Sequence, residues 1–348
     1  MRVPILLLVA GCTSVSDPLG PIPSQNIVVV ATAADDFSTG ALEVVSIEDW
    51  TVYGPITAVS GDPIVTYLGQ ELAQINRLGT DTIRLYDPTL WGAPNLEFSV
   101  GSGANPHAVV QCGEEVWTTL YARDYIARYA DGIEVGTIDL SSFSDADTLP
   151  EASDMVQIGD DVYVVLQRLN REEGWTPEPT GQVVRISCTD KTILQSWDVG
   201  PNSRLTKVVD EHIWVTPVTG PLTRIHTETQ TNEVIDIDFG DYQAQQTAWV
   251  SSSTGMAIGF KQDAGYGLFC IDSDTKDSTL ALETESYLTD IRRVGTHIWV
   301  SARRSWLDAS AFGGLMIWDP QTCTEITENQ WVRTGLDPVS ITWIPGDN

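Results

Sequence analysis

Short apolar runs separated by polar turns return at a regular interval along most of the chain. One kind of run is centred on an aromatic residue, and its clear copies are VWTT at Val116–Thr119, VYVV at Val162–Val165, IWVT at Ile213–Thr216 and IWVS at Ile298–Ser301. Fainter copies surround Val28, Ala73 and Ile258. Equivalent positions are 45, 44, 46, 51, 44 and 41 residues apart. A four-stranded propeller blade occupies about 40 to 50 residues, so the pattern predicts an all-β, seven-bladed β-propeller.

A second regular run follows each of these and stops at Asp, Thr, Pro or Gly, as a strand entering a turn should. Examples are DTIRLYDPT from Asp81, QVVRISCTD from Gln182 and GLMIWDPQT from Gly314. Outer strands such as EVGTIDL from Glu134 come next. No segment keeps a helical period. We therefore expect four strands in each blade.

The two ends of the chain complement each other. The tail DPVSITWI at Asp337–Ile344 is similar to the inner strand NPHAVV at Asn105–Val110 but has no second strand after it, whereas Asn26–Thr32 begins with a second strand that lacks a first. Pairing the C-terminal and N-terminal strands in one blade would close the ring and remove an open sheet edge. Because each repeat covers its neighbours, residues 26–348 are predicted to be one propeller domain.

The chain resembles the YVTN-type seven-bladed β-propeller repeats of bacterial surface and periplasmic proteins over nearly all of residues 26–344. The NPHAV segment and the VYV and IWV strands carry this resemblance. The Tyr-Val-Thr-Asn tetrad itself is absent, and blades 2 and 6 are degenerate. Propellers include both binding proteins and enzymes, so the resemblance implies the fold and leaves the function open.

The N-terminus indicates export. Met1–Gly11 contains one Arg and an apolar run that is too short to span a bilayer but fits the apolar part of a signal peptide. The segment VAGC at Val9–Cys12 resembles the bacterial lipobox, which implies cleavage after residue 11 and lipidation of Cys12. Thr13 after the Cys resembles lipoproteins that pass to the outer membrane. A plain secretory signal with an accidental Cys is the alternative.

Residues 12–25 carry three prolines and no apolar period, so we expect them to form a flexible tether between the lipid and the propeller. The chain contains 48 acidic and 19 basic residues, which gives it a formal charge of −29. Such a charge repels nucleic acid and anionic lipid, so contact with the membrane is expected only through the anchor. It favours cations or cationic partners, although acidic surfaces also simply keep secreted proteins soluble.

Four cysteines remain after Cys12, and an exported protein would pair them. Cys112 falls in the first turn of the third blade and Cys188 in the last turn of the fourth, on the same rim. Cys270 and Cys323 have a similar relation in blades 6 and 7. We therefore predict the disulfides 112–188 and 270–323. No Cys and His spacing suits structural zinc.

Three long connections, residues 141–153, 167–181 and 302–314, are expected on one face of the propeller, here called the top face. This face carries the connections between second and third strands and those between one blade and the next. Exposed Trp beside Arg is typical of a binding hot spot. The predicted ligand-binding residues are Arg123, Arg168, Trp175, Arg303 and Trp306. Two alternatives remain: the loops merely vary in length, and the arginines pair with neighbouring carboxylates.

Two sets of carboxylates are candidate metal ligands. Asp145, Asp147 and Glu151 lie within seven residues and would suit Ca²⁺, the only cofactor that the sequence suggests. A second set heads the inner strands and could converge on the axis: Asp62, Asp154, Asp290 and Asp337, with Asn105 and Asn202. Lactonase-like propeller hydrolases use such axial metals. The alternatives are a solvated acidic turn and polar groups that satisfy strand ends.

Catalysis by histidine finds little support, since His107, His212, His226 and His297 are not expected to meet in one triad or metal site. No GxSxG, HExxH or glycine-rich phosphate loop occurs. We therefore expect a monomeric, lipid-anchored binding module that recognises a protein, peptide or small molecule. The alternative is a metal-dependent hydrolase or lactonase acting at the channel mouth, and whether the protein is an enzyme stays open.

Overall fold

The computed structural model describes residues 21–209, 211–305 and 313–346. The expected signal peptide, Cys12 and most of the expected tether lie outside these residues. Two single-turn 3-10 helices, η1 (Ser141–Phe143) and η2 (Arg171–Glu173), are the helices of the described ranges. None of the helices in this part of the chain is long and apolar enough to cross a membrane.

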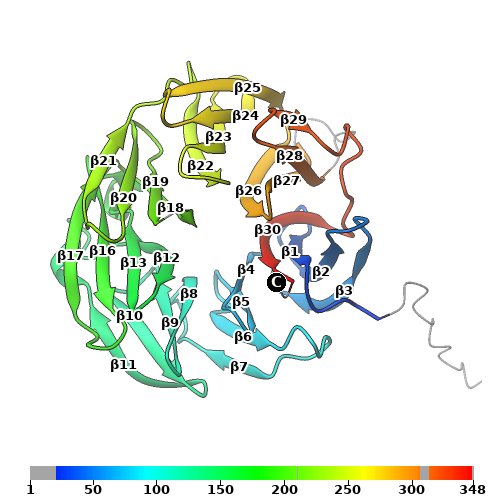
Figure 1. The fold of residues 1–348 in the computed structure, drawn as a ribbon. Helices are drawn as coiled ribbons and strands as arrows, with labels where there is room; N and C mark the ends of the chain where they lie inside the picture. The colour runs from blue at the N-terminus through cyan, green and yellow to red at the C-terminus, as the bar shows by residue number, and fades with distance from the viewer. Residues whose placement is uncertain (1–20, 210, 306–312, 347–348) are drawn as a thin grey trace, which may run out of the picture.

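The described residues form seven four-stranded antiparallel sheets around a central axis, as predicted (Figure 1). From the axis outward, blade 1 contains β30 (Asp337–Ile344), β1 (Ile27–Ala33), β2 (Gly40–Ser46) and β3 (Val52–Val59). Blade 2 contains β4 (Pro63–Tyr67), β5 (Leu72–Asn76), β6 (Thr82–Tyr86) and β7 (Leu96–Ser99). Blade 3 contains β8 (Pro106–Cys112), β9 (Glu115–Leu120), β10 (Tyr125–Ala130) and β11 (Ile133–Asp139).

Blade 4 contains β12 (Ala152–Ile158), β13 (Asp161–Leu166), β16 (Gly181–Ser187) and β17 (Ile193–Val199). Blade 5 contains β18 (Arg204–Val209), β19 (His212–Thr216), β20 (Leu222–His226) and β21 (Asn232–Ile235). Blade 6 contains β22 (Gln243–Trp249), β23 (Thr254–Lys261), β24 (Gly265–Asp272) and β25 (Asp277–Thr284). Blade 7 contains β26 (Tyr287–Val294), β27 (His297–Arg303), β28 (Gly314–Asp319) and β29 (Thr324–Glu325). A separate short hairpin pairs β14 (Leu169–Asn170) with β15 (Thr176–Pro177).

The core consists of apolar clusters at the junctions between blades. Ile27, Val29 and Ala31 of β1 pack toward blade 2. Val28 and Val30 of the same strand pack toward blade 7. This division follows from the two-residue period of a strand, which sends successive side chains to opposite faces. Neighbouring blades cover both faces of the inner strands of each sheet. These strands are therefore apolar almost throughout, which is why the repeats are recognisable in the sequence.

The ring closes as the sequence predicted. β30 pairs antiparallel with β1, from Ile27 opposite Ile344 to Ala33 opposite Asp337, so both chain ends contribute to blade 1 (Figure 1). The buried carboxylate of Glu43 accepts hydrogen bonds at 2.9 and 3.0 Å from the backbone N–H of Gly335, just before β30. Burial raises the pKa of Glu43.

Both predicted disulfides are present. Cys112–Cys188 joins blades 3 and 4 with a Cα–Cα distance of 5.4 Å, and Cys270–Cys323 joins blades 6 and 7 with a Cα–Cα distance of 5.8 Å. Each bridge therefore links two neighbouring blades covalently, in addition to the apolar contact between them. Two disulfides are typical of a protein that folds in an oxidising compartment.

The end of the expected tether contacts the propeller. Ile22 packs against the cluster between blades 1 and 2. The indole N–H of Trp91 donates to the carbonyl of Pro23 at 3.2 Å. Ile22 and Pro23 thus lie against the domain, and residues 12–20 of the expected tether lie outside the described residues.

Candidate functional site

Two of the three long connections meet on the top face beside blade 4. Residues 141–151 lead into β12, and residues 167–180 connect β13 to β16. The second connection is held in shape by a local cap, since the Asn170 side chain accepts hydrogen bonds from the backbone N–H groups of Glu172 and Glu173. Asn is a favoured cap because its oxygen satisfies N–H groups that the first turn of a helix leaves free. η2 then ends at Gly174, whose φ of 73° suits glycine.

Arg171 holds the two connections together. Its Nε donates to Glu151 Oε1 at 3.1 Å, and its Nη2 donates to the carbonyl of Tyr121 at 2.6 Å. Its backbone N–H donates to Asp147 Oδ2 at 2.9 Å. The guanidinium also lies over two rings, 5.0 Å from the centroid of Trp175 and 5.8 Å from that of Tyr121. One side chain therefore fixes the position of the hairpin relative to blade 3.

Aromatic rings lead from this hairpin toward the inner strands. Tyr121 stacks on His107, with centroids 4.3 Å apart and an interplanar angle of 12°, and lies 6.4 Å from Trp175 at 23°. The Tyr121 hydroxyl donates to Gln167 Oε1 at 2.7 Å. Burial, with the nearby charges of Arg77 and Arg204, holds the pKa of His107 well below its usual value, so this imidazole is neutral at pH 7. Burial raises the pKa of Tyr121.

Trp175 is the exposed end of the stack. It is 51% exposed, whereas Trp117, Trp214 and Trp299 of the second strands are buried. Its φ is 67°, in the left-handed region. That conformation costs a residue with a Cβ about 1–2 kcal/mol, because the Cβ approaches the following carbonyl oxygen. A bulky side chain held in this conformation at the surface is a candidate for function, because neither the conformation nor the exposure stabilises the fold.

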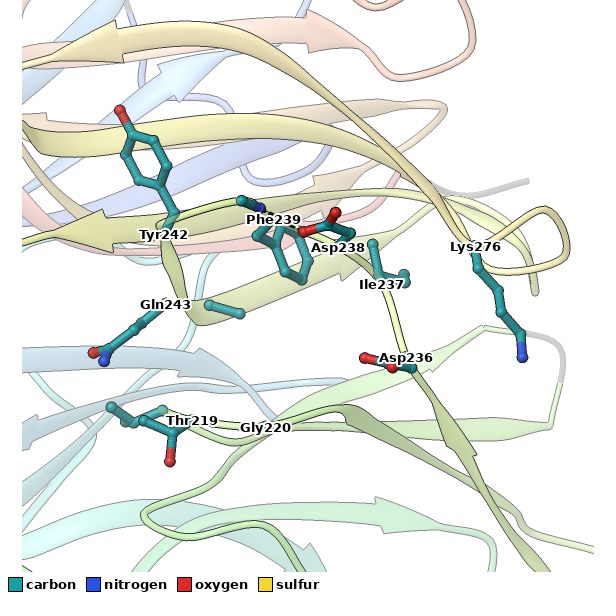
Figure 2. Close-up of a pocket in the computed structure, with 12 residues that line it drawn as sticks. Thr219, Gly220, Asp236, Ile237, Asp238, Phe239, Tyr242, Gln243 and Lys276 are labelled. Carbon is teal, nitrogen blue, oxygen red and sulfur yellow. Dashed lines mark hydrogen bonds between the residues drawn. The ribbon is translucent and has the colours of Figure 1, made fainter.

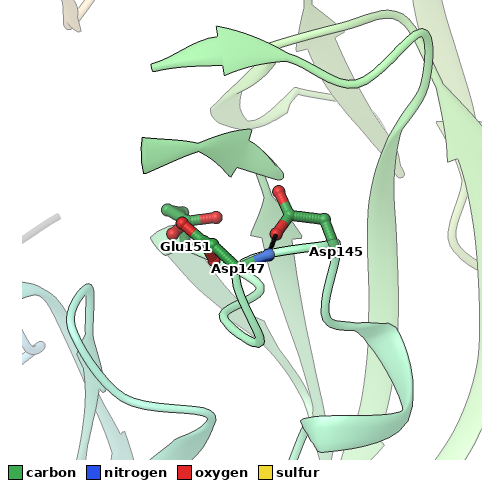
Figure 3. A group of neighbouring side chains, drawn as sticks. All are labelled: Asp145, Asp147 and Glu151. Atoms are coloured by element: carbon green, nitrogen blue, oxygen red, sulfur yellow. Dashed lines mark hydrogen bonds between the residues drawn. The ribbon is translucent and has the colours of Figure 1, made fainter. Parts of the chain in front are cut away.

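The predicted acidic cluster forms below the hairpin. Asp145, Asp147 and Glu151 each place a carboxylate oxygen within 4.8 Å of the others (Figure 3). Most of these oxygens have protein partners: Asp145 Oδ1 accepts from Asp147 N, Asp147 Oδ1 from Leu149 N, and Glu151 Oε2 from Leu169 N. Asp145 Oδ2 is buried without a hydrogen-bond partner. Burial is the main cause that raises the pKa of Glu151 to about 7, and burial also raises the pKa of Asp145.

The carboxylates predicted to ring the channel mouth each have a protein partner. Asp62 is paired with Arg77 at 2.5 Å, and Asp337 accepts from Arg304 N and Nε at 3.0 and 3.2 Å. Each of these two carboxylates is thus paired with an arginine beside it. Among the described residues, Asp145, Asp147 and Glu151 are the one group of three His, Cys, Asp or Glu residues with potential ligand atoms within 4.8 Å of one another.

Two members of the ring bridge neighbouring blades instead. Asp154 Oδ2 accepts from Leu205 N of blade 5 at 3.1 Å, and Asp290 Oδ2 accepts from Ile341 N of blade 1 at 2.9 Å. Inner strands are sheet edges, so their N–H groups need acceptors from outside their own sheet. Burial raises the pKa of Asp290.

The predicted ligand-binding arginines are engaged with the protein itself. Arg123 donates to the carbonyls of Ser102, Gly103 and Ala122. Arg168 donates to the carbonyl of Thr180 at 3.3 Å. Arg303 is 6% exposed, donates to the carbonyl of Ala34 at 2.9 Å and lies over the Phe37 ring at 4.1 Å. Loops leave carbonyl groups unpaired, and a guanidinium with five N–H groups can satisfy several of them. Trp306 lies outside the described residues.

The residues that the sequence analysis missed are Arg171, Tyr121 and His107. A signal for Arg171 was present, since Asn170, two glutamates and Gly174 are the pattern of a capped single turn that would set Arg171 and Trp175 at its two ends. Nothing local indicated Tyr121, whose contact with Arg171 spans 50 positions.

Two further features lie away from this site. His212 and His226 face each other across β19 and β20, with centroids 4.8 Å apart, and Glu211 Oε2 is 4.0 Å from His226 Nε2. The two imidazoles are neighbours because directly opposite residues on antiparallel strands lie side by side. A hollow of about 590 Å³ lies between blades 5 and 6. Figure 2 shows Asp236, Phe239 and Lys276 around it, and it contains none of the predicted site residues.

Comparison with known proteins supports the fold. No protein-family model matches the sequence, and no curated protein matches it significantly. The periplasmic gluconolactonase PpgL of Pseudomonas aeruginosa is similar with a TM-score of 0.60 and 13% identity over 92% of this chain and 97% of that one. The β-propeller domain of Cps50 (Swd1) from Myceliophteria thermophila gives 0.60 and 12% over 86% and 98%. The dihydro-heme d1 dehydrogenase NirN gives 0.56 and 15% over 94% and 76%. At these identities the similarity concerns the fold alone.

Proposed function

We propose that this protein is an extracytoplasmic binding module that captures its ligand on the top face beside blade 4. Trp175 carries the proposal, because it is exposed and yet held in a left-handed conformation by a built support of Arg171 and Tyr121. Pre-organised exposed Trp residues are typical anchors of interfaces. The proposed binding site stays on the top face that the sequence analysis favoured, but it is centred on the hairpin and not on Arg123, Arg168 and Arg303.

The test compares W175A with the parent protein in ligand capture and in urea unfolding. We expect capture to fall by about 30-fold, since truncating an anchor costs about 2 kcal/mol or more. The unfolding free energy should change by less than about 1 kcal/mol, since half of the side chain is already in solvent. Y287A, at another half-exposed aromatic residue on the top face near blade 7, is the matched control. Equal capture by W175A and the parent would refute the proposal.

The same proposal places the protein on a lipid anchor at Cys12, facing the periplasm or the outside of the outer membrane. The VAGC segment, the two disulfides and the acidic charge support this setting. Replacing Cys12 by Ser should move the protein from the membrane fraction to the soluble fraction and abolish labelling with palmitate. Unchanged labelling and fractionation would contradict the anchor.

Ca²⁺ at the acidic cluster is a second candidate, favoured by the unpartnered Asp145 Oδ2. The ion would have to share Glu151 and Asp147 with Arg171. Calcium at 1–5 mM would then raise the melting temperature of the parent protein but not of D145N, and magnesium would do less because it demands a tighter geometry. An equal shift in D145N would exclude the cluster. A hydrolase at the channel mouth is less favoured, because each carboxylate proposed for it is already engaged.

A further inference from the structure

We infer that the ligand of the hairpin platform is a cationic, lysine- or arginine-rich segment of a partner protein. The hairpin platform is the exposed surface of residues 170–178. This inference rests on the proposed function and adds the chemistry of the partner. The platform contains three glutamates besides Trp175: Glu172 and Glu173 are exposed, and Glu178 is half-buried. Among the described residues, none of their carboxylates has a hydrogen bond or an ion pair.

The basic residues of the platform do not neutralise these carboxylates. Arg171 is directed inward, where it is bound by Glu151 and the carbonyl of Tyr121. Arg168, just before the platform, donates to the carbonyl of Thr180. The glutamates therefore present unpaired negative charge to solvent, while the arginines are held within the loop.

Trp175 offers an aromatic ring on which a cation could bind on the same platform as these carboxylates. The Arg171 guanidinium lies 5.0 Å from the centroid of the indole, and the Tyr121 ring lies 6.4 Å from it. With both contacts in place Trp175 is still 51% exposed, so part of the indole is accessible to a ligand. A cation over an indole is attracted by the negative face of the ring, and flanking carboxylates strengthen that attraction. Lysine and arginine side chains combine this charge with an apolar stem that would cover the ring.

The net charge of the whole protein also favours a positively charged partner. A formal charge of −29 attracts cationic segments and repels anionic ones at long range. Charge alone would act equally at every acidic site, so it cannot select the platform. The selective element is the conjunction of the fixed indole with unpaired carboxylates.

The experiment measures binding of a fluorescein-labelled nine-residue oligoarginine to the full, disulfide-bonded protein by fluorescence anisotropy. Two triple variants remove the same charge: E172Q/E173Q/E178Q on the platform, and E114Q/D190N/E228Q in exposed turns on the opposite rim of blades 3, 4 and 5. We expect W175A and the platform triple each to weaken binding by at least 10-fold. The rim triple should weaken it by less than 3-fold, and binding to the parent should fall as salt rises.

Equal effects of the two triples would show non-specific attraction and overturn the inference, as would absence of peptide binding to the parent. Capture of partners from a native extract separates these results from the proposed function. If the parent ignores oligoarginine but W175A loses captured partners, the platform binds a ligand of other chemistry, and only the cationic inference fails. If W175A captures partners as well as the parent does, the proposed function fails too.

Discussion

Replacing Glu151 by Gln should change how the stability of the protein depends on pH. Glu151 is completely buried and its pKa is raised to about 7 from an ordinary value of 4.5. Below pH 4.5 the carboxyl is protonated in both the folded and the unfolded protein. Between pH 4.5 and 7 the folded protein keeps the proton that the unfolded chain releases, so the stability contributed by Glu151 falls as pH rises. Above pH 7 the loss is complete.

The magnitude follows from the two pKa values. One pKa unit corresponds to about 1.4 kcal/mol, so the rise to about 7 corresponds to about 3 kcal/mol between the two ends of the window. Gln cannot ionise. The free energy of unfolding of E151Q, measured relative to the parent, should therefore increase by about 3 kcal/mol between pH 4.5 and pH 8. Any fixed effect of the amide beside Arg171 cancels in this difference.

Urea unfolding followed by tryptophan fluorescence at several pH values, with EDTA present, measures this difference. E172Q is the matched control, since Glu172 is exposed in the same connection and has no ion pair among the described residues. Its difference from the parent should stay constant within about 0.5 kcal/mol. A difference between E151Q and the parent that is flat with pH, or that moves in favour of the parent at high pH, would refute the account of the buried carboxylate.

Three further predictions concern other parts of the molecule. W175G should be more stable than W175A by about 1 kcal/mol in urea unfolding, because glycine accepts the left-handed conformation at this position; equal stabilities would contradict the strain. The double variant C112A/C188A should lose about 4 kcal/mol of unfolding free energy, since the bridge spans 76 positions; an unchanged denaturation midpoint would show that the blades alone hold this junction. D290A should lose about 2 kcal/mol by leaving Ile341 N–H without its acceptor, whereas the exposed D274A should lose almost nothing; equal losses would mean that the bridge between blades does not stabilise the ring.

The fold could be predicted because its signal is local and repeated. Strands such as β9 and β27 are buried on both faces, so their apolar runs with a central Trp recur at the blade interval. Closure of the ring could be predicted because the C-terminal strand lacked a second strand and the N-terminal strand lacked a first one. The disulfides could be predicted from the rim of the propeller on which each Cys falls. These inferences need only strand order, which a propeller keeps constant.

The site could be predicted only in part, because its contacts depend on loop conformation. The sequence placed Trp175 and the acidic cluster on one face, and the structure joins them through Arg171. The other arginines were expected to face a ligand. They instead satisfy loop carbonyls, as Arg123 does, and no periodic pattern records how many carbonyls a loop leaves unpaired.

The hairpin combines two features that each lower stability, and both serve to hold the indole in place. Trp175 is strained, and Glu151 is a buried carboxylate whose ionisation at neutral pH is unfavourable. Glu151 nevertheless orients Arg171, whose guanidinium lies 5.0 Å from the centroid of the indole. A connection fixed in this way before the ligand arrives loses little conformational entropy on binding, so more of the contact energy appears as affinity. Combining E151Q with W175G should therefore give a protein whose stability relative to the parent increases between pH 4.5 and pH 8 and which binds more weakly, the trade expected where stability has been given up for a pre-organised site.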